Sequence, residues 1–103
     1  MSRDEILGIL NEHRPKLLGF GVGSLALFGS IARDEAHAGN DVDILVEFDG
    51  PPSFSRFMDL KFYLEDLLGC PVDLVTRRAL KPRLRTRVEE EAVDVPGFQT
   101  VSG

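Results

Sequence analysis

Apolar residues follow two different periods along this chain, and each period predicts a different kind of element. Short runs rich in Val, Leu and Ile occupy 22–28, 41–48 and 72–76, each bordered by residues that favour turns. These runs predict three β-strands. A helix is predicted between the last two strands, with Ser53 as its N-cap and Gly69 directly after its end. Its apolar stripe recurs every three or four residues, at Phe57, Leu60, Leu64, Leu67 and Leu68.

The remaining pattern predicts three further helices and a fourth strand. Ser2 followed three residues later by Glu5 is a capping box and begins the first helix, which Pro15 ends or restarts. A short helix is predicted over 31–36, with a loop over 37–40. The last helix is predicted from Pro82 to about residue 92, because proline is favoured in a first helical turn. An edge strand over 93–95 follows it.

This order of elements predicts an α/β (α+β) fold, in which helices pack mainly on one face of a small mixed sheet of three or four strands. The chain has 103 residues, of which 43% are hydrophobic and 28% charged, as expected for one globular domain. We place that domain at residues 1–95. Residues 96–103 are expected to form a frayed tail.

Composition narrows the possible functions. The net charge is −5, which argues against direct binding of nucleic acid. No apolar stretch approaches the roughly 20 residues that a membrane-spanning helix needs, and no signal peptide is evident, so a cytoplasmic protein without a membrane partner is expected. Cys70 is the single cysteine, which rules out an internal disulfide. Nothing in the sequence predicts the homo-oligomeric state.

Two carboxylates open the second strand. Side chains alternate along a strand, so Asp41 and Asp43 share one face with Leu45 and Glu47. The opposite, apolar face is formed by Val42, Ile44, Val46 and Phe48. Residues two positions apart lie roughly 6–7 Å apart along the strand. Such a pair can converge on one hard cation such as Mg²⁺, which prefers a few carboxylates, waters and phosphate oxygens. A solvated strand start would have the same pattern.

A Gly-Ser pair closes the first strand. Gly29 allows a tight turn, and Ser30 can cap the next helix so that the first backbone N–H groups of that helix point at an anion. The pair is a candidate seat for a triphosphate, although an ordinary serine N-cap has the same sequence. A third carboxylate, Asp73, interrupts the third strand. If this strand lies beside the Asp41 and Asp43 strand, Asp73 joins their face; otherwise it is an exposed strand residue.

Taken together, these residues resemble a known family. The chain resembles the minimal nucleotidyltransferases of the DNA-polymerase-beta-like superfamily in three segments: Leu27–Arg33, Asp41–Phe48 and Val72–Thr76. The ten residues between Gly-Ser and Asp-x-Asp match the spacing of that family. The resemblance extends from about residue 5 to residue 95. It departs from the family at Asp34, where glycine is common, and at Asn40, where serine is common.

The resemblance implies a nucleotidyltransferase fold and transfer of AMP from Mg-ATP to a hydroxyl group. Asp41, Asp43 and Asp73 match the catalytic carboxylates that hold two Mg²⁺ ions. Gly29, Ser30 and Arg33 match the nucleotide-binding residues. The family's larger members carry an additional substrate domain, for which 103 residues leave no room.

The acceptor must therefore come from elsewhere. The resemblance implies a partner toxin with a HEPN RNase domain, silenced by AMP on one of its tyrosine hydroxyls, so that the chain acts as an antitoxin. Two alternatives remain: an antitoxin that neutralises its toxin by contact alone, and an enzyme that nucleotidylates a small molecule such as an aminoglycoside. Which nucleotide is used, and how many AMP units are added, cannot be predicted from the sequence.

Two features fall outside the motif. Half of the twelve basic residues lie within 77–87, and Glu89, Glu90 and Glu91 follow directly. This arrangement opposes the dipole of the predicted last helix, and it is either a solvated face or a patch for a partner protein or for substrate phosphates. His37 lies in the loop before Asp41 and could approach a nucleotide.

Overall fold

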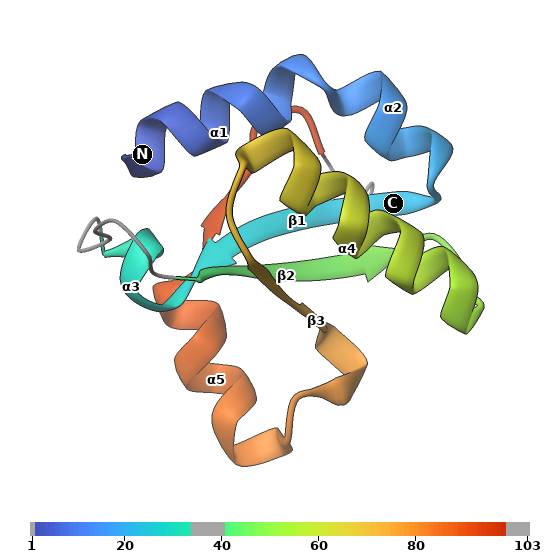
Figure 1. Ribbon diagram of the computed structural model, residues 1–103. Helices are drawn as coiled ribbons and strands as arrows, with labels where there is room; N and C mark the ends of the chain where they lie inside the picture. Colours follow the sequence, from blue (N-terminus) through green and yellow to red (C-terminus); the bar gives the residue numbers. More distant parts are fainter. Residues whose placement is uncertain (1, 34–40, 99–103) are drawn as a thin grey trace.

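The computed structural model describes residues 2–33 and 41–98, and in these residues a four-stranded mixed sheet carries helices mainly on one face (Figure 1). The strands are β1 (Val22–Phe28), β2 (Val42–Phe48), β3 (Val72–Thr76) and β4 (Val93–Asp94). Their order across the sheet is β3-β2-β1-β4. β1 is antiparallel to both β2 and β4, whereas β2 and β3 are parallel. The predicted mixed sheet is confirmed.

Three helices cover one face of the sheet: α1 (Arg3–Glu12), α2 (Arg14–Gly19) and α4 (Phe54–Leu68) (Figure 1). Their boundaries follow local sequence signals. The Ser2 hydroxyl accepts the Glu5 N–H at 3.2 Å, and the Ser53 hydroxyl accepts the Arg56 N–H at 3.1 Å. Gly69 ends α4 in the left-handed conformation, at φ 70°. These caps and the restart of the helix at Pro15 agree with the predictions.

The hydrophobic core lies between these helices and the sheet. Val42, Ile44 and Val46 point from β2 into it, and Leu60 and Leu64 meet them from α4. All five are 5% exposed or less. The predicted apolar faces of β2 and α4 are therefore the faces that pack, since burying apolar surface is the main favourable contribution to folding.

α3 (Gly29–Ala32) and α5 (Pro82–Glu91) lie on other sides of the sheet, with α5 opposite α4 (Figure 1). A 3₁₀ turn, η1 (Arg77–Ala79), connects β3 to the segment before α5. α3 begins at Gly29, two residues earlier than predicted, and Phe28 occupies its N-cap position without a side-chain hydrogen bond. The prediction of Ser30 as the N-cap is wrong, because the positive φ of Gly29 turns the chain into the helix before Ser30 is reached.

The core extends past residue 95. β4 pairs with β1, the N–H of Val95 donates to the Leu25 carbonyl at 2.9 Å, and Val95 and Phe98 are both buried. The folded unit therefore reaches at least Phe98, beyond the predicted boundary. Residues 99–103, together with Asp34, His37 and Asn40, lie outside the described residues. No helix in the described part of the chain is long and apolar enough to cross a membrane.

Candidate active site

The parallel pairing of β2 with β3 brings two of the predicted carboxylates side by side. Asp43 is the register partner of Asp73 across the two strands. Neighbouring strands are about 4.8 Å apart, and register partners point to the same face of the sheet. The two side chains are close enough to share a hydrogen bond and to repel each other as charges. The sequence predicted that Asp73 would join Asp43 if their strands were neighbours, and the structure shows that β2 and β3 are neighbours.

The environment of Asp43 disfavours its negative charge. Partial burial raises the pKa of the Asp43 carboxyl above its ordinary value, and repulsion from Asp73 and the hydrogen bond to it raise this pKa further. Asp41 adds a weaker repulsion, whereas the positive charge of Arg33 lowers the pKa. A carboxylate in this setting gains stability from any cation that it binds.

Gly29 lies directly against Asp43. Its φ is +69°, and a Cβ at this position would overlap the Asp43 Oδ2 atom and come within 3.1 Å of Cγ. Phe28, the residue before it, is the register partner of Asp43 on β1. The chain thus turns from β1 into α3 in contact with Asp43, and it can do so only because residue 29 has no side chain.

Asp41 lies one residue before β2 and is exposed. Within the described residues, no three His, Cys, Asp or Glu side chains already converge at the distances of a metal site. The Asp43 and Asp73 pair nevertheless fits a hard divalent cation, because its donors are carboxylate oxygens and the repulsion between them favours a bound positive charge. Mg²⁺ asks for few protein ligands and takes water and phosphate oxygens for the others.

The other two predicted residues belong to α3. Ser30 lies in the first turn of this helix, where backbone N–H groups have no partner within the helix. Arg33 is the C-cap residue, and its guanidinium contacts the Glu91 carboxylate of α5 at 3.2 Å. Glu91 could not be identified from the sequence, because its ion pair with Arg33 joins residues that are far apart along the chain.

The carboxylate face is not simply solvated. Leu45 shares this face with Asp43, and its register partners are Ala26 on β1 and Val75 on β3. Leu45 and Ala26 are each only 1% exposed. α5 contacts β1 and α3 on this side of the sheet. The alternation in β2 predicted which residues share the face but not that its middle is buried, since only the tertiary structure brings α5 over it.

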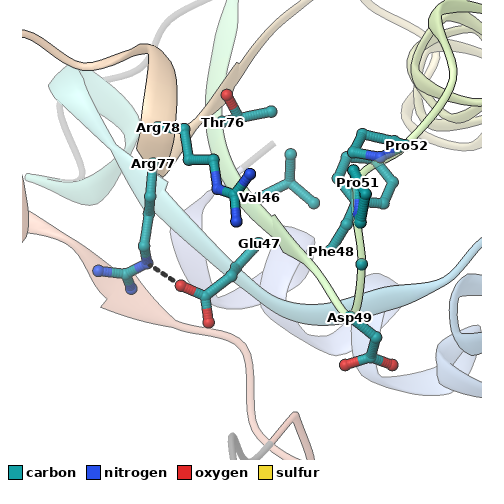
Figure 2. Close-up of a pocket in the computed structure, with 10 residues that line it drawn as sticks. Val46, Glu47, Phe48, Asp49, Pro51, Pro52, Thr76, Arg77 and Arg78 are labelled. Atoms are coloured by element: carbon teal, nitrogen blue, oxygen red, sulfur yellow. Dashed lines mark ion pairs between the residues drawn. The ribbon is translucent and has the colours of Figure 1, made fainter.

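A separate pocket of about 290 Å³ lies at the opposite end of β2 and β3 from the carboxylates (Figure 2). Phe48, Pro51 and Pro52 form one side, and Arg77 and Arg78 from η1 form another. Arg77 contacts Glu47 at 3.6 Å, as the dashed line in Figure 2 marks, and Glu89 of α5 at 2.7 Å. Sequence reasoning did not find this pocket, because its walls come from two segments that are far apart in the chain, 46–52 and 76–78.

A mixed sheet with two carboxylates on adjacent parallel strands and a Gly-Ser turn against them is the arrangement of a nucleotidyl-transfer fold. Comparison with known proteins gives the same class: the nucleotidyltransferase domain family matches residues 3–95. The chain belongs to this family and is a nucleotidyltransferase with the fold of the minimal type.

Three relatives illustrate the match. The protein adenylyltransferase MntA of Thermococcus cleftensis is 44% identical over 96 residues, covering 92% of this chain and 97% of its own. A solved minimal nucleotidyltransferase superposes with a TM-score of 0.78 at 35% identity, covering 90% of this chain and 95% of its own. A toxin–antitoxin structure with AMP-PNP has a TM-score of 0.68 at 24% identity, covering 96% of this chain and 76% of the other, and it shows a shared fold.

Proposed function

We propose that this nucleotidyltransferase transfers AMP from Mg-ATP to a tyrosine hydroxyl of a partner protein, a HEPN-type toxin that the modification silences. The observation that carries the proposal is the pairing of Asp43 with Asp73 on adjacent parallel strands, with Gly29 directly against Asp43. The identity to a protein adenylyltransferase supports AMP as the transferred group. The toxin–antitoxin structure with AMP-PNP, together with the resemblance noted from the sequence, supports a toxin as the partner.

Each site residue has a role in this proposal. Asp41, Asp43 and Asp73 would hold two Mg²⁺ ions, which when bound neutralise phosphate charge and lower the pKa of the attacking hydroxyl. Gly29 lets the chain turn directly against Asp43, which brings the start of α3 beside this carboxylate. The first-turn amides of α3, including that of Ser30, donate to phosphate oxygens. Arg33 adds a positive charge next to Asp43, and it would exchange its contact with Glu91 for one with phosphate.

The chemical step balances without a covalent enzyme intermediate. The tyrosine oxygen forms a bond to the α-phosphorus of ATP, and the bond from this phosphorus to the oxygen that bridges to the β-phosphate breaks. Pyrophosphate leaves with the electron pair, and the phenolic proton passes to solvent. Such a transfer depends on in-line positioning and charge stabilisation, which this site can supply.

The proposal is tested with Asp43→Asn. Asparagine has nearly the same size, but it removes a charged metal ligand. We expect the rate of AMP transfer from labelled ATP to a tyrosine-bearing protein acceptor to fall at least roughly 10²-fold. Asp66→Asn is the matched control, because Asp66 is an exposed aspartate of α4, on the other face of the sheet, and its transfer rate should equal that of the wild type.

Transfer by Asp43→Asn at the wild-type rate would remove Asp43 from the site. If the wild type binds the toxin tightly but labels nothing, the chain acts by contact alone. If label appears only on an aminoglycoside, the acceptor is a small molecule.

A further inference from the structure

We infer that residues 77–87, called here the basic segment, form a docking surface for an acidic region of the protein that carries the acceptor tyrosine. This inference rests on the proposed function, because it names the surface that delivers the acceptor. The segment contains six of the twelve basic residues and no acidic one: Arg77, Arg78, Lys81, Arg83, Arg85 and Arg87. The other residues of the chain include six basic and seventeen acidic ones, so the segment is a positive region on a negative molecule.

Much of this positive charge is not neutralised within the molecule. Arg77 pairs with Glu47 and Glu89, but Arg78, Lys81 and Arg83 make no ion pair in the described part of the chain. All three are exposed. Cations that the fold leaves exposed without an anionic neighbour are available to a partner of opposite charge.

Stability does not account for this sequence. The positive charges gather at the start of α5 and the negative ones at its end, where each sign is unfavourable to the helix dipole. No residue of α5 is buried, so apolar packing does not hold this helix strongly. Glu89 and Glu91 at the end of α5 are compensated by ion pairs with Arg77 and Arg33, but Lys81 and Arg83 at its start have no ion pair in the described part of the chain. Sequence choices that oppose local stability without compensation are expected where a surface has another role.

The apolar features of the segment favour a protein partner over a nucleic acid. Leu84 lies among the cations and is 45% exposed. Arg78 lies at the 290 Å³ pocket, opposite Phe48, Pro51 and Pro52 (Figure 2). Protein interfaces typically combine arginines with an apolar side chain seated in a pocket, whereas binding to nucleic acid depends chiefly on phosphate contacts.

The position of α5 suits delivery of an acceptor. The helix runs from η1 towards α3 on the carboxylate side of the sheet, and Glu91 at its end contacts Arg33, which in turn acts on Asp43. A protein that binds at η1 and the start of α5 and extends along the exposed side of this helix would therefore reach the carboxylates at its other end.

The test measures binding of a fluorescent random copolymer of Glu and Tyr by anisotropy, without ATP or Mg²⁺. The double variant Lys81→Gln/Arg83→Gln should raise the Kd at least roughly tenfold at low salt, and the difference should shrink as salt rises. The matched control is Lys16→Gln/Arg56→Gln, which removes two exposed basic residues from α2 and α4 and should leave the Kd unchanged. Leu84→Ser should also weaken binding, at all salt concentrations.

Equal weakening in both double variants would overturn the inference, because net charge alone would then explain it. An unchanged Kd in Lys81→Gln/Arg83→Gln would also overturn it, as would tighter binding of poly(U) than of the copolymer. Because binding is measured without ATP or Mg²⁺, these results do not depend on the transfer reaction. Where transfer occurs, the same double variant should raise the KM for the copolymer and leave the KM for ATP unchanged.

Discussion

At the scale of single residues, Gly29 and Asp43 constrain each other. The positive φ of Gly29 disfavours any other residue, and its missing side chain lets the Asp43 carboxylate approach the turn. Gly69 also has a positive φ, but a Cβ added there would have nothing within 4 Å. Alanine substitutions at the two glycines therefore separate the cost of a left-handed backbone from the cost of overlap with the Asp43 carboxylate.

We expect Gly69→Ala to lower the free energy of unfolding by about 1–2 kcal/mol, the cost of a left-handed non-glycine residue. Gly29→Ala should lower it by at least about 1 kcal/mol more, because the new Cβ overlaps the carboxylate. Adding Asp43→Ala to Gly29→Ala should recover this excess. Urea unfolding of the four proteins measures the effect, and equal losses at both glycines would show that Asp43 moves aside without cost.

At the scale of elements, the chain after α5 completes the core. β4 is only two residues long, yet it aligns the following segment along β1 so that Val95 and Phe98 reach the apolar interior. Phe98 is 8% exposed, whereas Phe54 at the start of α4 is 79% exposed. Two phenylalanines of the same chain thus lie in opposite environments.

Phe98→Ala should reduce the free energy of unfolding by about 3 kcal/mol or more, through lost burial and the cavity left behind. Phe54→Ala should change it by no more than about 0.5 kcal/mol, since its side chain is already in water. Chemical denaturation of both variants compares them directly. A change at Phe98 as small as that at Phe54 would mean that the core closes without this residue.

At the scale of the whole molecule, negative and positive side chains are concentrated in different places, and the negative charge on Asp43 lowers the stability of the fold. The carboxylate pair gathers negative charge on one side of the sheet, and the basic segment gathers positive charge on α5. Because the pKa of Asp43 is raised in the folded state, that state binds the proton more tightly than the unfolded chain does. The charged Asp43 therefore destabilises the fold above its raised pKa, and this penalty fades as the pH falls towards the ordinary value of 3.8.

In EDTA at pH 7, we accordingly expect Asp43→Asn to melt a few degrees higher than the wild type. The gap should narrow as the pH is lowered, because Asp43 then becomes protonated in the wild type as well. Adding Mg²⁺ with ATP should narrow it too, by stabilising only the protein that keeps its ligand. Scanning calorimetry over pH, with and without Mg-ATP, tests this. A wild type that melts higher than Asp43→Asn in EDTA would contradict the assigned repulsion.

Local sequence signals were enough to predict the four strands, most of the helices and many of the residues that face the core. Caps such as Ser53 and Gly69, and the alternation of Val42 with Asp43, act between near neighbours, so their effect can be predicted from a short segment. For the same reason the Gly-Ser turn and the carboxylate strands could be found, together with the nucleotidyltransferase family that they indicate. The N-cap of α3 escaped prediction because it depends on the φ of one glycine.

How these parts meet depends on the tertiary structure. The sequence left open whether Asp73 joins Asp43, and the parallel register of β2 and β3 places them together. It gave no sign that Leu45 is buried on the carboxylate face, that Glu91 contacts Arg33, or that Phe98 enters the core. Each of these results depends on packing between segments far apart in the chain, and the periodicity of a single segment carries no information about which other segment will cover it.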